Sequence, residues 1–201
     1  MKRREFIGST LATASLAAIP GMLAASADPF DGQILRTGHI GVGSQGRHHL
    51  ENMVKLPGFE IRTLCDVLPF QMNAAMKMVG PGTDAVTDYR RILDDPEIDA
   101  VVIATPFNFH AQPMIDALDA GKHVYCEKTL VKGFDQIEQT AGAVAHSDRI
   151  VQAGYQHRYS KHLREVAALI RSGHIGSISK VECQWNRSTD WRRPVPSPDY
   201  E

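Results

Sequence analysis

The stretch "HIGVGSQGRHH", residues 39–49, decides the fold class. It places Gly41, Gly43 and Gly46 in the spacing Gly-x-Gly-x-x-Gly, directly after an apolar run and at the start of an amphipathic one. In a dinucleotide site the first glycine permits a tight turn, the second lets a pyrophosphate approach the backbone, and the third lets the helix pack on the strand. The stretch therefore predicts a strand, a phosphate-binding turn and a helix.

Two further features of this region support a dinucleotide site. Ser44 and Gln45, at the N-terminus of the predicted helix, offer free backbone N–H groups and the positive end of the helix dipole to phosphates. The next apolar run, "FEIRTLCD", ends in Asp66, about 20 residues past Gly46, where such sites place a carboxylate for the adenosine ribose hydroxyls. The alternative is that Asp66 caps the next helix. An aspartate repels a 2′-phosphate and residues 67–69 supply no arginine to bind one, so we predict NAD in preference to NADP.

Short apolar runs alternate with longer amphipathic runs through most of the chain. This alternation predicts an α/β fold with a doubly wound parallel sheet that is covered on both faces. The predicted strands span residues 34–40, 60–65, 100–104, 123–126 and 150–153, and the predicted helices span residues 45–56, 69–79, 110–120 and 134–147. Arg36, Thr37 and His39 make the first strand more polar than a central strand usually is. Either a polar side chain reaches a neighbouring loop or the strand has a different register.

The pattern continues beyond Gly154 and then stops. A helix is predicted at residues 161–171 and a strand at residues 177–185, and a polar, proline-punctuated tail follows. We therefore expect a second α/β layer that begins in this chain and is not completed. The predicted domains are an export signal at 1–27, a nucleotide-binding domain at 33–154 and the start of a substrate domain at 155–201.

The N-terminus has the composition of a cleavable export signal. Residues 1–27 combine a basic start, an uncharged run and a small-residue ending, which predicts cleavage after Ala27. A membrane-spanning helix is the alternative, but Pro20 and Gly21 interrupt the run and it is only weakly apolar. The paired arginines at residues 3–4 resemble a twin-arginine signal, whose route exports folded proteins. We predict a periplasmic protein with no stable membrane span after cleavage.

Overall composition indicates an ordinary folded protein. The 201 residues are 43% hydrophobic and 22% charged with a formal net charge of -1, which gives no sign of disorder or of nucleic-acid binding. Cys65, Cys126 and Cys183 are odd in number, and no pair has the spacing of metal ligands. We predict buried reduced thiols and no metal site.

Two more segments are expected to end at the ligand-binding edge of the sheet. The run "VVIATPFNFHA" places Thr105 and Pro106 after a strand, where the loop to His110 should cover the nicotinamide side of a cofactor. His110 itself is expected to cap the following helix in preference to transferring protons. The run "HVYCEKTL" ends at the same edge in Glu127 and Lys128, an acid beside a base.

Together these motifs resemble the Gfo/Idh/MocA oxidoreductases. The resemblance covers residues 34–185 and rests on the glycine motif, Asp66, "ATPFNFHA", "ALDAGKHVYCEKTL" and "VQAGYQHRYSKHLREVAALIRSGHIG". It implies a Rossmann doubly wound parallel sheet, followed by an α/β domain that carries the substrate site and often an oligomer interface. The family acts mostly on sugars, polyols and related compounds.

The resemblance also implies roles for individual residues. Lys128 would point at the substrate hydroxyl as the catalytic group visible in this chain, and Glu127 would lie near the nicotinamide ribose. Thr129 replaces the usual proline of the Glu-Lys-Pro signature. His157 and Arg158 lie where the family passes into its substrate domain, so they are expected to contact substrate or to be structural. The family's catalytic His would lie beyond Glu201, which implies a fragment or a truncated product.

Three functions remain open at this point. The first is an NAD-dependent oxidoreductase of a sugar, polyol or glycoside, which is homo-oligomeric when full length. Because free cofactor is scarce outside the cytoplasm, an exported enzyme would keep NAD bound and regenerate it in each cycle. The second is an NAD-dependent glycoside hydrolase that oxidises its substrate transiently. The third is a scaffold that keeps the nucleotide fold without catalysis.

Overall fold

The computed structural model describes residues 32–184, 186 and 188. The predicted export signal and the predicted cleavage after Ala27 lie outside the described residues. The chain divides into two compact units, Met1–Gly154 and Tyr155–Glu201, which are described separately below.

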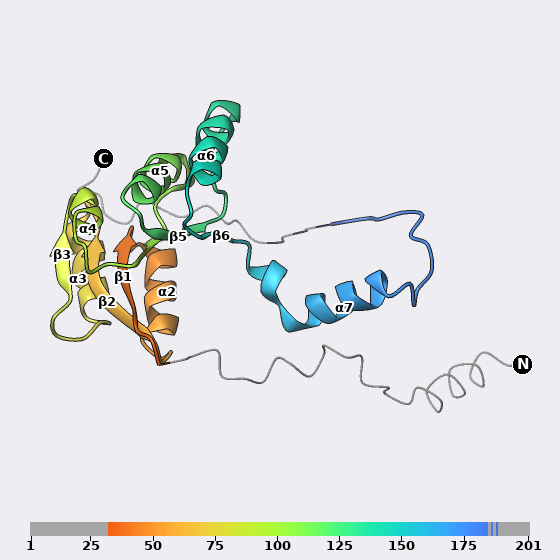
Figure 1. Cartoon of the computed structure of the whole chain (residues 1–201). Helices are drawn as coiled ribbons and strands as arrows, with labels where there is room; N and C mark the ends of the chain where they lie inside the picture. The colour runs from red at the N-terminus through yellow and green to blue at the C-terminus, as the bar shows by residue number, and fades with distance from the viewer. Residues whose placement is uncertain (1–31, 185, 187, 189–201) are drawn as a thin grey trace, which may run out of the picture. The chain divides into compact units, whose positions relative to one another are not determined.

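The first unit is built on a parallel sheet with the strand order β3-β2-β1-β4-β5-β6 (Figure 1). The strands are β1 (Leu35–Ile40), β2 (Phe59–Cys65), β3 (Asp84–Val86), β4 (Ala100–Ile103), β5 (His123–Glu127) and β6 (Val151–Gly154). All of the neighbouring strands pair in parallel. This order is that of a doubly wound dinucleotide fold, whose ligands bind at the carboxyl edge beside β1 and β4. The predicted α/β fold class is confirmed.

Helices connect the strands and cover the sheet. They are α2 (Ser44–Met53), α3 (Pro69–Met76), α4 (Arg90–Leu93), α5 (Ala111–Asp119) and α6 (Phe134–His146), with a 3-10 turn η1 (Phe107–Phe109). The four longer helices were predicted, although α2 and α3 end three residues earlier than expected. Sequence periodicity missed β3 and α4, because elements this short do not complete enough turns or alternations to show a period.

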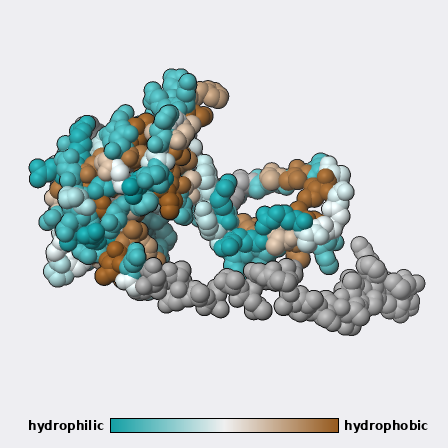
Figure 2. Space-filling view, viewed as in Figure 1, coloured by the Kyte–Doolittle hydropathy of each residue, from teal (hydrophilic) through white to brown (hydrophobic). Residues whose placement is uncertain are grey.

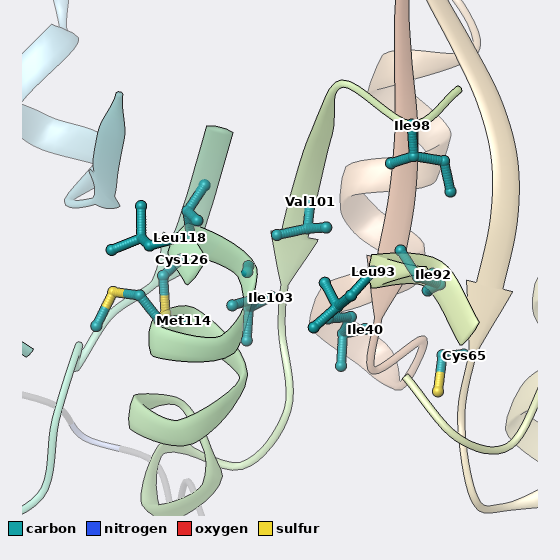
Figure 3. Packing of buried hydrophobic residues seen from close by; sticks show 12 residues of the cluster. Ile40, Cys65, Ile92, Leu93, Ile98, Val101, Ile103, Met114, Leu118 and Cys126 are labelled. Carbon is teal, nitrogen blue, oxygen red and sulfur yellow. The ribbon is translucent and has the colours of Figure 1, made fainter. Parts of the chain in front are cut away.

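Alternation along the strands separates two hydrophobic clusters. Leu64 and Cys65 are neighbours on β2 and therefore point to opposite faces. Leu64 packs in a small cluster with Val42 of the glycine loop, Leu50 of α2 and Ala75 of α3. Cys65 packs in the larger cluster, which is formed by the other face of the sheet with α4 and α5 (Figure 3). The sheet is thus covered on both faces, as the alternating pattern predicted.

The polar residues of β1 have specific partners. β1 lies between β2 and β4, so it is a central strand in spite of its polarity. The guanidinium of Arg36 donates to both carboxylate oxygens of Asp99, at 3.1 and 3.2 Å, in the loop before β4. The expectation that a polar residue reaches a neighbouring loop is confirmed. The register shift with β2 between Thr37 and Gly38 also departs from a regular strand.

His39 is fully buried on the α2 face of β1, and its hydrogen bonds fix its tautomer. The Thr37 hydroxyl donates to the Glu60 carbonyl at 3.2 Å, so its oxygen is left to accept from His39 Nε2–H at 3.3 Å. His39 Nδ1 then carries a lone pair that has no partner among the described residues. Burial, with a smaller contribution from His49, lowers the pKa of His39 to about 3. The ring is neutral at physiological pH.

The second unit contains a 3-10 turn, η2 (Gln156–Tyr159), and the amphipathic helix α7 (Lys161–Arg171). Hydrophobic residues lie at its surface (Figure 2). The strand predicted at 177–185 is absent from residues 177–184, the part that is described. A strand needs a neighbouring backbone to pair with, and no described residue pairs with this segment. Its apolar side chains, including Val181 at 74% exposure, are in solvent.

The cysteines only partly match their prediction. Cys65 and Cys126 are free and buried, and burial raises the pKa of each thiol to about 12, so both are unreactive. Cys183 is exposed, and its prediction as a buried thiol is wrong, because it lies in the segment that does not form a strand. Within residues 32–184 no group of three or more His, Cys, Asp or Glu residues could hold a metal ion. No helix in the same part of the chain has the length and apolarity to cross a membrane.

Candidate active site

The three glycines of the motif lie at the carboxyl edge of the sheet, each in a different environment. Gly41 has a φ of +86°, and a Cβ there would lie 2.7 Å from the backbone nitrogen of Thr105. A Cβ on Gly46 would overlap the carbonyl oxygen of Gly41. At Gly43 no described atom lies within 4 Å of the Cβ position. The outer two glycines therefore permit close packing, whereas Gly43 leaves its backbone open to a ligand.

Helix α2 begins directly after Gly43, and its first intrahelical hydrogen bond is donated by Arg47 to the Gly43 carbonyl. The N–H groups of Ser44, Gln45 and Gly46 precede that bond, as the first N–H groups of any helix do. The positive end of the helix dipole therefore faces the open side of Gly43. This combination is suited to binding a phosphate, and the predicted phosphate-binding role of these residues stays a prediction.

Asp66 follows β2 and connects the glycine loop to the next turn. One carboxylate oxygen accepts from Val42 N–H and the other from Leu68 N–H, both at 2.9 Å. Leu68 is the N-cap of α3, which has no side-chain cap, so Asp66 orders the turn before the helix. Each carboxylate oxygen keeps acceptor capacity for a ribose hydroxyl. Asp66 thus has a structural role in addition to its predicted ligand role.

Thr105 and Pro106 follow β4 at the same edge. The Thr105 hydroxyl is buried and has no hydrogen-bond partner among the described residues. A buried hydroxyl without a partner is costly unless a ligand or a water completes it. Together with the open backbone at Gly43 and the helix dipole, this hydroxyl makes the edge suitable for a dinucleotide.

His110 is 1% exposed and lies between two loops of this edge. Its Nδ1 is 2.8 Å from the Thr129 carbonyl oxygen, and its Nε2 is 2.8 Å from the Thr105 carbonyl oxygen. His110 occupies the N-cap position of α5 but makes no side-chain cap hydrogen bond to the described backbone, so that part of its prediction is wrong. Because both ring nitrogens face carbonyls of the protein, the residue joins the loops after β4 and β5.

Glu127 ends β5 and is the most heavily bonded carboxylate of the edge. It is 7% exposed, and its Oε1 lies 2.8 Å from His49 Nε2 and 3.2 Å from Gln45 Nε2. The Tyr125 hydroxyl also donates to Oε1 at 3.4 Å, and Lys128 N–H donates to Oε2 at 3.1 Å. Burial alone would raise the pKa of Glu127, but the hydrogen bonds and charge from His49, with the other donors, lower it overall. The carboxylate is therefore ionised.

Lys128 is exposed, directly after the buried Glu127. Its ammonium has no hydrogen bond or ion pair to another residue of the described part of the chain. The peptide bond between Lys128 and Thr129 is cis. The site thus presents an ammonium, unpaired among the described residues, beside a fixed carboxylate, at the edge where the glycine loop also lies.

The remaining predicted site residues, His157 and Arg158, lie on η2 of the second unit. Both are exposed, and they line an open pocket of about 390 Å³ with residues of α7: Leu163, Arg164, Ala167 and Arg171. Their predicted contact with substrate stays a prediction.

Sequence inspection missed His49 and Tyr125 as members of the site. Gln45 and His49 are four residues apart, which places them on one face of α2. Tyr125 and Glu127 are two residues apart, which places them on one face of β5. These spacings are visible in the sequence, but the pairing of the two faces spans 78 residues and required the structure.

Comparison with known proteins identifies the family. The family model described as "Oxidoreductase family, NAD-binding Rossmann fold", named GFO_IDH_MocA, matches residues 35–155. The chain belongs to this family. Its resemblance to Gfo/Idh/MocA proteins is confirmed, and NAD is confirmed as the cofactor that the family binds.

Individual relatives include sugar-related and polyol-related enzymes. The chain is 30% identical over 142 residues to the uncharacterized oxidoreductase YrbE of Bacillus subtilis, covering 70% of this chain and 41% of YrbE. It is 29% identical over 170 residues to inositol 2-dehydrogenase of Salmonella typhimurium, covering 83% of this chain and 51% of that protein. It is 26% identical over 168 residues to alpha-N-acetylgalactosaminidase of Shewanella oneidensis, covering 80% of this chain and 37% of that protein.

A solved structure gives the same comparison in three dimensions. Scyllo-inositol dehydrogenase from Lactobacillus casei, with bound NAD(H) and scyllo-inositol, superposes with a TM-score of 0.66 at 30% identity. The match covers 72% of this chain and 43% of that one. The chain therefore spans about half the length, or less, of the relatives that it matches.

Proposed function

We propose that this chain carries the cofactor-binding and hydroxyl-orienting part of an NAD-dependent oxidoreductase of a polyol or sugar. The observation that carries the proposal is the unpaired ammonium of Lys128, next to the buried Glu127 and at the edge that bears the glycine loop. The inositol dehydrogenases among the relatives support a cyclic polyol as the first substrate class to test.

The residues of the edge divide the binding of NAD between them. The N–H groups of Ser44, Gln45 and Gly46 would hold the pyrophosphate, and Asp66 would accept from the adenosine ribose hydroxyls. Thr105 supplies an unpaired hydroxyl on the nicotinamide side, next to Pro106. When bound, NAD supplies the hydride acceptor for oxidation of a secondary alcohol.

Lys128 would act on the substrate hydroxyl. Its ammonium can donate a hydrogen bond to the oxygen of the alcohol and so hold the carbon that bears the hydride toward the cofactor. Glu127 keeps its carboxylate directed at α2 and at the Lys128 backbone, so it does not form an ion pair with the ammonium. Lys128 thus orients and polarises the hydroxyl, and a separate base would accept the proton.

A second function has one specific observation in its favour. The similarity to an alpha-N-acetylgalactosaminidase supports a glycosidase that oxidises its substrate transiently and returns the hydride. Both functions use the same NAD site and the same Lys128, so the site alone favours neither. Inositol 2-dehydrogenase matches at slightly higher identity than the glycosidase and the match covers more of this chain, which supports testing the oxidoreductase first.

The remaining proposals concern the whole protein. We propose that it is exported in folded form with NAD bound, on the twin-arginine pattern at residues 3–4, and that it regenerates the cofactor in each cycle. Fractionation of cells that produce the protein tests this proposal. The protein recovered from the exported fraction should release NAD when it is unfolded. We also propose that His157 and Arg158 contact the substrate and that the protein is a homo-oligomer.

The function is tested by adding polyols, sugars and aryl glycosides to the protein with NAD. An oxidoreductase produces NADH, which is followed by its absorbance, whereas the glycosidase releases the aglycone with no net NADH. Lys128→Met should abolish either activity and leave NADH binding intact. Lys55→Met is the matched control, because Lys55 forms only an exposed pair with Glu51. Full activity in Lys128→Met would refute the assigned role.

A further inference from the structure

The backbone of Lys128 is anchored on both sides. The residue before it, Glu127, is bound through its carboxylate to helix α2. The residue after it, Thr129, is bound through its carbonyl to His110. Lys128 is itself exposed, so its ammonium is free while its main chain is fixed by its two neighbours.

The anchor on the Glu127 side depends mainly on His49. The two side chains approach to 2.8 Å, and they are only 18% and 9% exposed. The His49 ring also packs edge-on against Tyr125, with ring centroids 5.1 Å apart and an interplanar angle of 71°. Gly154 on β6 leaves space for this cluster, since a Cβ there would lie 2.8 Å from the Tyr125 hydroxyl and 3.2 Å from Glu127 Oε1.

The anchor on the Thr129 side depends on His110. Its ring lies between two backbone carbonyls, which can only accept hydrogen bonds, so the ring is the donor in this anchor. The second carbonyl belongs to Thr105, whose hydroxyl is unpaired at the nicotinamide side. His110 therefore sets the separation of the loop after β4 from the loop that carries Lys128.

We propose that His49 and His110 are positioning residues for Lys128, His49 through the carboxylate of Glu127 and His110 through the carbonyl of Thr129. This inference rests on the proposed function of Lys128. A displacement of about 1 Å in an orienting group can cost about 10²-fold in rate. Since α2 also begins at the phosphate-binding loop, the His49 anchor ties the position of Lys128 to the helix that holds the cofactor.

The test compares turnover with cofactor binding in the whole protein. His49→Leu should lower kcat by about 10²-fold, whereas the dissociation constant of NADH should change by less than tenfold, about 1.4 kcal/mol. His49→Gln keeps a donor for Glu127 and should recover most of the lost kcat. His48→Leu is the matched control, because His48 is exposed on the same helix and, among the described residues, its side chain is hydrogen-bonded only to Asn52.

For His110 the corresponding variant is His110→Asn, whose amide can donate to one of the two carbonyls. It should lower kcat more than it weakens NADH binding. The control is His146→Asn, since His146 is exposed on α6 and contacts the backbone of its own helix. If His110→Asn does not fold, His110→Gln is measured in its place. A kcat equal to that of the wild-type protein in the folded variant would overturn the role of His110.

A double variant shows whether His49 acts through Glu127. In a Glu127→Gln background, His49→Leu should cause less than a further threefold loss of kcat, because neighbouring residues in one network are not additive. If the losses of kcat in Glu127→Gln and His49→Leu multiply in the double variant, the proposal is overturned. Full kcat in His49→Leu would also overturn it. If Lys128→Met is itself fully active, the proposed function fails. If Lys128→Met is inactive and His49→Leu is fully active, only the positioning role of His49 fails.

Discussion

Acid should destabilise the first unit through His39. The pKa of an unperturbed histidine is near 6.5, and burial lowers the pKa of His39 to about 3. Because the folded-state pKa is lowered, the unfolded chain binds the proton first as the pH falls. The stability contributed by the neutral ring is therefore complete above pH 6.5 and is lost progressively down to about pH 3.

The magnitude follows from the difference in pKa. Each unit of pKa difference corresponds to about 1.4 kcal/mol, so the full loss is about 5 kcal/mol, and the loss at a pH two units below 6.5 is about 3 kcal/mol. That amount is a large fraction of the 5–15 kcal/mol that typically stabilises a folded domain. Among the described residues no group accepts a hydrogen bond from a proton on Nδ1, so nothing there offsets the cost of charging the buried ring.

Urea unfolding of the protein and of His39→Leu, at neutral pH and at a pH near 4.5, measures this contribution. The variant removes the group that binds the proton and replaces it with an apolar side chain of similar size. We expect the wild-type protein to lose about 3 kcal/mol more than the variant over this pH change. Acidic groups such as Glu127, whose pKa is also lowered, stabilise the fold less at the lower pH, and this loss is equal in both proteins. Equal losses in the two proteins would refute the reasoning about His39.

Three other predictions concern the edge of the sheet. Gly46→Ala should abolish NADH binding in a calorimetric titration, because its Cβ would overlap the Gly41 carbonyl, whereas Gly142→Ala, where no described atom is within 4 Å, should bind normally. Asp66→Asn should weaken NADH binding by about tenfold, the cost of roughly one hydrogen bond to a charged group. It should also reduce the preference for NADH over NADPH. An unchanged ratio of the two dissociation constants would contradict the assignment of Asp66 to the adenosine ribose. Gly154→Ala should lower kcat in a steady-state assay, because its Cβ would displace Glu127, and an unchanged kcat would show that this carboxylate has no part in placing Lys128.

The nucleotide half of the site could be predicted because its determinants are close in sequence. The spacing of Gly41, Gly43 and Gly46 and the position of Asp66 depend on one strand, one turn and one helix. The structure adds the physical reason for each, such as the close approach of Gly41 to Thr105. Fold class followed from the same alternation of strand and helix.

The part of the site around Lys128 could be predicted only in part. Glu127 and Lys128 were found at a strand end, but the binding of Glu127 to His49 joins residues that are far apart in the chain. His110 was expected at the start of a helix and is there, yet its ring bonds to loops, because it lies between the carbonyls of Thr105 and Thr129. Propensity along the chain does not contain this information.

In the second unit the sequence predicted a strand that the described residues do not form. Residues 177–185 alternate in a way that is typical of a strand, but the described residues of this segment pair with no neighbour. A strand is stabilised by the backbone beside it, so a local pattern cannot establish it alone.

Transfer of deuterium tests the central claim most directly. The protein is mixed with NAD and with inositols or hexoses that carry deuterium on the carbinol carbons, and the cofactor is then analysed by mass spectrometry. We expect deuterated nicotinamide with the wild-type protein, and none with Lys128→Met although that variant still binds NADH. Absence of deuterium from the cofactor of an NAD-bound wild-type protein, with every compound of the panel, would contradict it.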